Sequence, residues 1–179
     1  MNLEPRCARR AFLTAASALF IGLRFARVAA AAEARRISFV HTHTGETLDT
    51  VYFENGAYVA DAMKRVAHLL RDFRSGDEHP IDPPLLDYLV DLRMLAGIDA
   101  PYQVISGYRS PHTNAELRRR SSGVSEHSLH MEGRAIDVRI EGFPTERLHE
   151  LALKMRRGGV GFYPSSNFVH LDTGRVRSW

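Results

Sequence analysis

Two short alternating segments in the C-terminal third of this 179-residue chain constrain its fold most strongly. Residues 135–140 read AIDVRI, and residues 168–172 read FVHLD. Because successive side chains of a β-strand point to opposite faces, the apolar residues of each segment face a core and the polar ones face the other side. The segments therefore predict two strands, one carrying Asp137 on its open face and the other carrying His170 and Asp172.

Other segments predict further strands and helices. Residues 36–53 alternate around HTGE, which is typical of a β-hairpin, and YQVIS at 102–106 predicts a strand. Apolar residues at helical spacing predict a helix over 59–73. Asp82, followed by two prolines, predicts the start of another helix, and Gly97 predicts its end.

Two more helices are expected in the second half of the chain. Thr113 and Glu116 have the spacing of a capping box. Apolar residues from Leu148 to Met155 predict a helix that ends at Gly158 and Gly159. No repeat, low-complexity tract or linker follows residue 35, so the chain is expected to form one domain. The predicted fold class is α+β, with a small, mainly antiparallel sheet flanked by helices.

The N-terminal stretch RCARRAFLTAASALFIGLRFARVAAAAEARR has the layout of a secretory signal. A pair of arginines precedes an apolar run over 11–23, and the order RRAFL resembles a twin-arginine export signal. This run is shorter than the roughly 20 residues that span a bilayer, although an uncleaved anchor is the alternative. We expect residues 1–32 to be a signal peptide and residues 33–179 to be a periplasmic domain that meets the membrane only during export.

Removing this segment changes the charge and the cysteine content of the chain. Five of the 24 basic residues and one of the 21 acidic residues lie in residues 1–32, so 19 bases and 20 acids remain and the formal charge is −1. No nucleic-acid partner is expected for such a domain. The single cysteine, Cys7, also lies in this segment, which excludes disulfides, thiolate catalysis and a cysteine-based zinc cluster. Any metal must then be held by His, Asp or Glu.

A candidate metal site follows from His130, Asp137 and His170. In SLHMEGRAID, at residues 128–137, Gly133 supplies a turn that can fold His130 back beside Asp137. If the two alternating strands are neighbours, all three side chains can meet at one point. Two imidazoles and one carboxylate suit zinc and leave a fourth position open for water, as in catalytic zinc sites. The alternative is a set of structural hydrogen bonds.

Two longer stretches, SGYRSPHTNAELRRRSSGVSEHSLHMEGRAIDV and GGVGFYPSSNFVHLDTGRVRSW, resemble the zinc peptidases related to D-alanyl-D-alanine carboxypeptidase, lysostaphin-type enzymes and the hedgehog fold. More narrowly, residues 35–179 resemble the exported murein endopeptidase K branch of these peptidases. The resemblance implies a Zn²⁺ ion held by His130, Asp137 and His170. It also implies a substrate, the stem peptides of bacterial peptidoglycan, with cleavage of bonds between two diaminopimelate residues and between D-alanine and diaminopimelate.

The general base is less clear than the metal ligands. Many relatives carry an acid three residues before the last metal-binding histidine, or a histidine two residues before it. This chain has Asn167 and Phe168 there, and neither side chain can act as a base. Asp172 is the candidate base because it shares a strand face with that histidine, and the alternative is that it orients the histidine. His127 and Glu132 are weaker candidates.

Arg109 is the second candidate catalytic residue. The resemblance places this arginine, in SGYRSPHTN, beside the metal site, where its guanidinium can bind a peptide carboxylate or stabilise a developing oxyanion. The alternative is a loop arginine that makes surface ion pairs. Solvent exposure is expected for His112. Structural roles are expected for the histidines at positions 41, 43, 68, 79 and 149.

Two functions stay open at this point. The first is a periplasmic zinc endopeptidase that hydrolyses peptidoglycan cross-links, and the second is a zinc-containing protein that binds peptidoglycan without cutting it. A serine peptidase that uses Ser106 or Ser125 is disfavoured because neither serine lies in a G-x-S-x-G turn. A regulatory or adaptor protein is a further partner that the sequence does not identify.

Overall fold

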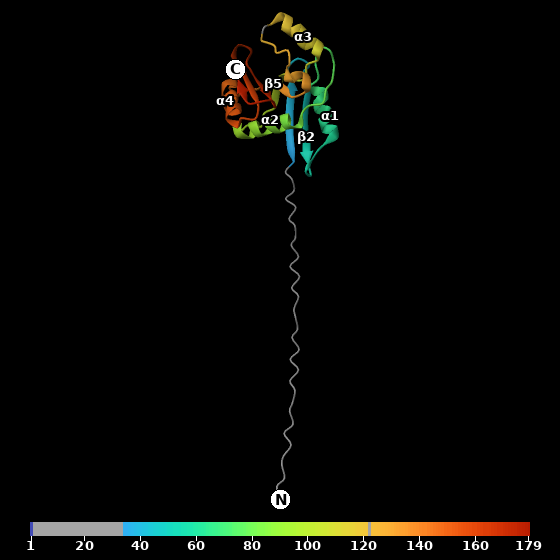
Figure 1. The fold of residues 1–179 in the computed structure, drawn as a ribbon, viewed down its shortest axis with the longest axis vertical. Coiled ribbons are helices and arrows are strands. Elements are labelled where there is room, and N and C mark those ends of the chain that lie inside the picture. The colour runs from blue at the N-terminus through green and yellow to red at the C-terminus, as the bar shows by residue number, and fades with distance from the viewer. Residues whose placement is uncertain (2–33, 122) are drawn as a thin grey trace. The chain divides into compact units, whose positions relative to one another are not determined.

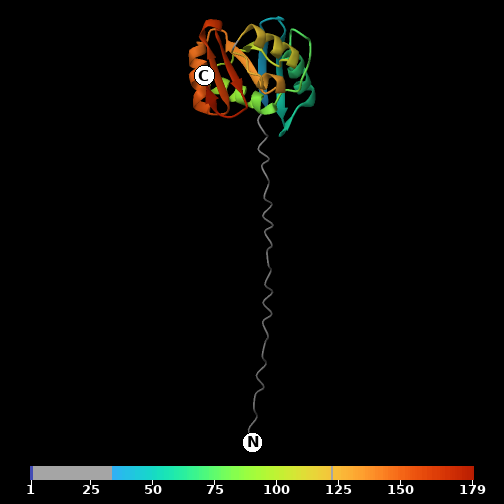
Figure 2. The same cartoon turned by 45° about the horizontal axis from the view of Figure 1, so that its top comes forward.

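The computed structural model describes Met1 and residues 34–121 and 123–179, and the predicted signal peptide therefore lies outside the described residues. No helix in the described ranges has the length and apolar character needed to cross a membrane. From residue 34 onward the chain forms the predicted α+β fold (Figure 1). Figure 2 shows β1 and β2 with α1 at one side of this unit, and the C-terminal strands with α4 at the other.

An eight-stranded, mostly antiparallel sheet is the centre of the fold, and it is larger than the small sheet that the sequence predicted. In spatial order the strands are β3 (Ala57–Tyr58), β2 (Thr47–Glu54), β1 (Arg35–His41), β4 (Tyr102–Ser106), β5 (Ala135–Ile140), β7 (Phe168–Asp172), β6 (Gly159–Tyr163) and β8 (Arg177–Ser178). The pairs β1–β4 and β6–β8 are parallel, and the other neighbours are antiparallel. The predicted hairpin and the three other predicted strands are confirmed.

Four α-helices and two short 3₁₀-helices accompany the sheet. They are α1 (Ala60–Leu69), α2 (Pro83–Ala96), α3 (Pro111–Arg120), η1 (Leu129–Glu132), α4 (Thr145–Met155) and η2 (Pro164–Ser166). Helix α1 ends at Leu69, four residues earlier than its apolar spacing predicted. The reason is that the buried carboxylate of Asp72 accepts the N–H groups of Arg74 (3.0 Å) and Ser110 (2.9 Å) and so fixes a turn there.

One hydrophobic core lies against the central strands, as the alternation predicted. Ile136, Val138 and Ile140 of β5 are buried together with Val169 and Leu171 of β7. Helices α2 and α4 contact each other as well as the strands of this region and bury leucines in the same cluster. Each fully buried apolar side chain contributes roughly 1.5–3 kcal/mol to folding. The core therefore fixes which face of β5 and β7 is left for polar side chains.

The predicted capping box of α3 is wrong. The capping residue is Ser110, whose hydroxyl accepts the N–H of Thr113 at 3.2 Å, and Pro111 follows it in the first turn. The Ser-Pro pair supplies the cap three residues earlier than expected, so Thr113 lies inside the helix. Glu116 instead makes ion pairs along the helix surface.

The predicted end of α4 at Gly158 and Gly159 is also wrong. The helix ends at Met155, and its C-cap residue Arg156 adopts the left-handed conformation with φ 52°. The two glycines lead into β6, where a Cβ on Gly158 would lie 1.8 Å from the backbone oxygen of Asp172. A Cβ on Gly159 would lie 2.4 Å from the Asp172 carboxylate. These glycines therefore allow close approach to Asp172 rather than ending a helix.

Candidate metal centre

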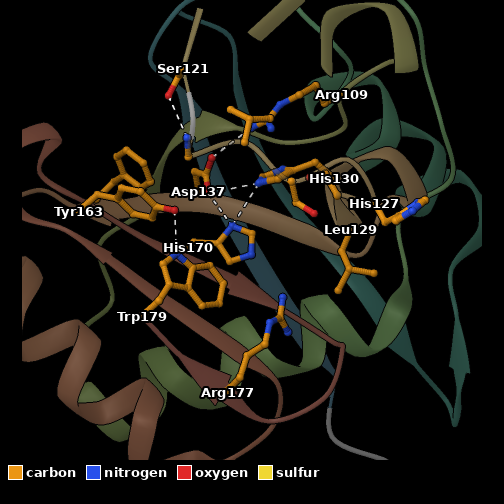
Figure 3. Close-up of a pocket in the computed structure, with 15 residues that line it drawn as sticks. Arg109, Ser121, His127, Leu129, His130, Asp137, Tyr163, His170, Arg177 and Trp179 are labelled. Atoms are coloured by element: carbon orange, nitrogen blue, oxygen red, sulfur yellow. Dashed lines mark hydrogen bonds and ion pairs between the residues drawn. The ribbon is translucent and has the colours of Figure 1, made fainter. Parts of the chain in front are cut away.

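The register between β5 and β7 brings two of the predicted ligands together. Asp137 lies directly opposite His170 in this antiparallel pair, and Ala135 lies opposite Asp172. Directly opposed side chains lie about 5 Å apart at their Cβ atoms and share one face of the sheet. Because the neighbouring residues of both strands are in the core, Asp137 and His170 project from the open face (Figure 3).

His130 reaches the same point from η1. Gly133 ends η1 with φ +65°, and a Cβ there would lie 2.1 Å from the carbonyl oxygen of Pro80. A glycine is therefore required for the turn that returns the chain into β5. The ring of His130 is held from behind, because its Nδ1 lies 2.7 Å from the carbonyl oxygen of Gly107. Nδ1 carries the proton in this hydrogen bond, which leaves the lone pair of Nε2 facing the site.

The three donor atoms have the spacing of a metal site. His130 Nε2 lies 3.3 Å from Asp137 Oδ1 and 3.2 Å from His170 Nδ1, and the last two atoms are 2.9 Å apart. Ligands about 2.0–2.1 Å from a tetrahedral ion lie about 3.3 Å from one another. All three side chains are buried. The residues present therefore fit one small divalent cation with a remaining coordination position, and this is the one such group among the described residues.

Asp172 holds the far side of the His170 ring. His170 Nε2 lies 3.0 Å from Asp172 Oδ2, so Nδ1 is the ring atom left for a metal. Asp172 is fully buried, and Oδ1 also accepts the N–H groups of Gly159 (2.9 Å) and Gly174 (2.8 Å). Arg177 binds both oxygens, at 3.1 and 2.7 Å. This geometry favours the orienting role over the predicted role as general base, because neither oxygen is free to face the pocket.

The ionisable groups of the site shift one another's pKa strongly. Burial lowers the pKa of His130, and the nearby Asp137 offsets part of this effect. Burial alone would raise the pKa of Asp137, but the two histidines outweigh it and hold that pKa well below its usual range. Burial alone would lower the pKa of His170, yet the hydrogen bonds with Asp137 and Asp172 raise it to about 9. Without a metal, His170 therefore carries the positive charge at neutral pH.

A pocket opens onto the three donor atoms. Its wall includes residues 123–125 and 127–129, together with two arginines and three aromatic residues: Arg109, Arg177, Tyr163, Phe168 and Trp179 (Figure 3). The backbone of β4 shifts register between Val104 and Ser106, which places Ser106 opposite Asp137. Such an irregularity redirects the side chains that follow it. The chain leaving β4 thus carries Arg109 to the rim of the site.

Arg109 lies beside the metal ligands, as the family resemblance implied. Its Nη2 is 3.6 Å from Asp137 Oδ2, and its side chain is 11% exposed. The contacts with Asn114 and Ser106 are long, at 3.4 and 3.5 Å, and the buried Nε has no partner within the described part of the chain. Burial lowers the pKa of Arg109, although an arginine stays charged in proteins. Its loosely bound donors remain able to bind an anionic group in the pocket.

The structure distinguishes between the weaker candidates for the general base. His127 lines the pocket but is exposed, whereas Glu132 is exposed and pairs with Arg134 at 3.1 Å. His112 lies on the surface of α3, as expected. Asn167 accepts a hydrogen bond from Thr145 and does not line the pocket.

Several residues that build the site were not assigned a role from the sequence. Gly107 contributes only its backbone carbonyl oxygen, and a sequence motif cannot predict such a contribution because every residue has one. Arg177 and Trp179 lie in the family-like ending RVRSW, so their position in that motif was the available signal. Tyr163 lies in the same family-like stretch, in GFYPS, and it reaches the pocket through the register of β6 with β7.

This fold and this site define a class of protein. An α+β domain in which two histidines and one aspartate leave a coordination position open beside a charged pocket has the design of a mononuclear metal-dependent hydrolase. The family model described as peptidoglycan L,D-endopeptidase MepK, an M15 peptidase family, matches residues 29–179. The chain belongs to this family.

Individual relatives agree with the family assignment. The peptidoglycan L,D-endopeptidase MepK of Escherichia coli K12 is 45% identical over 145 residues, which cover 81% of this chain and 80% of the relative. The Shigella flexneri protein of the same name matches equally well. The probable peptidoglycan L,D-endopeptidase MepK of Haemophilus influenzae is 40% identical over 146 residues, covering 81% of this chain and 78% of the relative.

The raised pKa of His170 predicts how the stability of the metal-free protein changes with pH. A group whose pKa is about 9 when folded and about 6.5 when unfolded stabilises the fold fully below pH 6.5 and loses this effect as pH rises through 9. The free energy of unfolding should fall by about 3 kcal/mol from this group between pH 6 and pH 10. Chemical denaturation with chelator present measures it. His170→Gln should remove most of this pH dependence of the free energy of unfolding, whereas the control His112→Gln should retain it. The same pH dependence in the wild type and both variants would contradict the raised pKa of His170.

If Asp172 orients His170, its removal should weaken metal binding before it affects any chemical step. Asp172→Ala is expected to lower metal affinity about 10- to 100-fold, and Asp172→Asn less, because the amide oxygen can still accept from the imidazole. A competition titration with a chromogenic chelator measures this. Asp49→Ala, which removes a carboxylate paired with Arg36 on the surface, is the matched control. Wild-type metal affinity combined with lost turnover in Asp172→Ala would restore Asp172 as the general base.

Proposed function

We propose that this protein is a zinc-dependent murein endopeptidase that hydrolyses the peptide cross-links of bacterial peptidoglycan. The observation that carries the proposal is the buried His130–Asp137–His170 group at the floor of a pocket that also contains Arg109. The relatives named peptidoglycan L,D-endopeptidase support the same reaction. The bond between two diaminopimelate residues is the proposed main target, and the bond between D-alanine and diaminopimelate is the second.

Zinc is the proposed metal because the donor set suits it. Two imidazole nitrogens and one carboxylate oxygen, with outer hydrogen bonds from each ring, are typical of catalytic zinc sites. Zinc supplies Lewis acidity and lowers the pKa of water to about 7. The protein itself supplies the rest: the carbonyl of Gly107 and the carboxylate of Asp172 fix the two rings, so that one nitrogen of each faces the site.

Arg109 is proposed to hold the substrate. Cross-linked stem peptides carry carboxylates, and a guanidinium binds a carboxylate through two parallel hydrogen bonds. Among the described residues the Nε of Arg109 has no hydrogen-bond partner, and both terminal nitrogens make only long contacts, so Arg109 has donors for this purpose. Its distance of 3.6 Å from Asp137 keeps the bound group next to the metal ligands.

We also propose that the protein works in the periplasm after twin-arginine export. The arginine pair before the apolar run supports this, and so does a substrate that lies outside the cytoplasm. Mass spectrometry of the chain isolated from a periplasmic fraction tests it, with loss of about 32 residues expected. A full-length chain in the cytoplasmic fraction would contradict it.

Defined cross-linked muropeptide dimers test the proposed reaction. The zinc-loaded protein should convert diaminopimelate–diaminopimelate dimers into monomers, and a chelator or the His170→Ala substitution should abolish product formation. Chromatography with mass spectrometry identifies the bond that is cut. Tight binding of intact dimers without any product would instead identify a peptidoglycan-binding protein, which the loss of the usual base position makes a real alternative.

Arg109→Lys tests substrate holding in the same assay. The substitution keeps the charge but loses the planar fork, so kcat/KM should fall about tenfold or more, mainly through KM. Metal content should stay at one ion per chain, because Arg109 donates no metal ligand. Unchanged kinetics would show that the arginine only packs against the loop.

A further inference from the structure

Tyr163 and Trp179 form a hydrogen-bonded pair at the edge of the metal pocket. The indole Nε1–H of Trp179 donates to the hydroxyl of Tyr163 at 2.8 Å, and both side chains line the pocket. Figure 3 shows the phenol hydroxyl directed inward, between Asp137 and the Trp179 ring. Neither residue is part of the metal site or contacts Arg109 through a hydrogen bond in the described chain.

The position of Trp179 is built into the sheet. Its backbone extends the β6–β8 pairing, since its N–H donates to Val160 (3.3 Å) and its carbonyl accepts from Phe162 (3.1 Å). Gly161 lies opposite His170 in the β6–β7 register, and a Cβ there would come within 2.6 Å of the indole. The ring of Trp179 thus occupies the space that a side chain at position 161 would fill, 5.2 Å from the His170 ring.

The position of the Tyr163 ring is also fixed by its neighbours. Tyr163 stacks on Phe168, its register partner across β6 and β7, with ring centroids 4.5 Å apart and planes 16° apart. An indole N–H can only donate, so its hydrogen bond occupies a lone pair of the Tyr163 oxygen. The phenol keeps its own proton, for which residues 34–121 and 123–179 offer no acceptor. The Tyr163 hydroxyl is therefore fixed in position and can still donate one hydrogen bond to a bound molecule.

We propose that the Tyr163 hydroxyl is a catalytic hydrogen-bond donor to the carbonyl oxygen of the scissile peptide bond, and that Trp179 is the residue that positions it. This inference rests on the proposed hydrolysis. A donor held in place before the reaction stabilises the negative charge that develops on that oxygen, without any cost of reorganisation at that moment. The phenol keeps its proton throughout, so it adds no proton transfer to the hydrolysis.

Tyr163→Phe removes the hydroxyl and keeps the ring, and therefore separates hydrogen bonding from packing. With cross-linked dimers as substrate, kcat should fall about 10- to 100-fold and KM should change less than about twofold, because the bond strengthens as the oxyanion forms. Tyr58→Phe is the matched control. It removes a phenol hydroxyl that donates to Asp87 at the opposite edge of the sheet, and it should leave kcat unchanged.

A second readout does not depend on turnover. A phosphinate pseudo-dipeptide, in which a tetrahedral P(O)(O⁻)–CH₂ unit replaces the scissile amide, presents the oxygen that Tyr163 should bind. Calorimetry should show that Tyr163→Phe weakens phosphinate binding by about the factor lost in kcat, while the affinity for zinc is retained. Trp179 is the single tryptophan of the chain, so its fluorescence checks that the wall is intact in the variant.

Trp179→Phe provides the independent variant. It keeps an aromatic ring over Gly161 but loses the N–H that orients the phenol, so kcat and phosphinate affinity should each fall about three- to tenfold. If Tyr163→Phe does not fold, this variant decides the question by the same two measurements. Wild-type kcat and wild-type phosphinate affinity in the folded variant would overturn the role of Tyr163, as would an effect confined to KM. A wild-type protein that cuts no cross-link would instead overturn the proposed function.

Discussion

The opposition of Asp137 and His170 across β5 and β7 is the constraint on which the site depends. Their donor atoms lie 2.9 Å apart in a buried environment, with His130 Nε2 close to both. With Asp172 behind His170, two carboxylates surround one imidazole, and such a group is stable only with a positive charge between them. A proton on His170 supplies this charge in the metal-free protein. A divalent cation that replaces this proton supplies more positive charge.

The surrounding structure serves to hold these donors in place. The carbonyl of Gly107 and the carboxylate of Asp172 fix which nitrogen of each ring faces the site. Asp172 can be fully buried because Gly158 and Gly159 let the backbone pass close to it and Arg177 balances its charge. The same C-terminal strands carry the aromatic wall of the pocket, so metal binding and substrate contact depend on one small part of the sheet.

Much of this arrangement could be predicted from the sequence because it follows from local rules. Alternation in AIDVRI and FVHLD predicted the strands and their polar faces, and Gly133 predicted the turn that returns His130. The sequence offered two roles for Asp172 and could not decide between them, since the orienting role depends on Gly159, Gly174 and Arg177, which lie close only after folding.

The helix boundaries and the aromatic pair were harder for different reasons. Ser110 competes with Thr113 as a cap, and only the fold decides between them. Arg156 adopts a backbone conformation that usually marks glycine, so the pattern pointed to the wrong residue. The contact between Tyr163 and Trp179 depends on the parallel pairing of a two-residue strand, which carries almost no periodic signal.

A crystal structure of the zinc-loaded protein, with anomalous data collected at the zinc absorption edge, tests the central claim most directly. The account predicts one ion per chain, bound by Nε2 of His130, Nδ1 of His170 and a carboxylate oxygen of Asp137, each about 2.0–2.2 Å from the metal. Asp172 should remain hydrogen-bonded to Nε2 of His170, away from the metal. An ion bound elsewhere, no anomalous peak among these three residues, or coordination through Nε2 of His170 would contradict it.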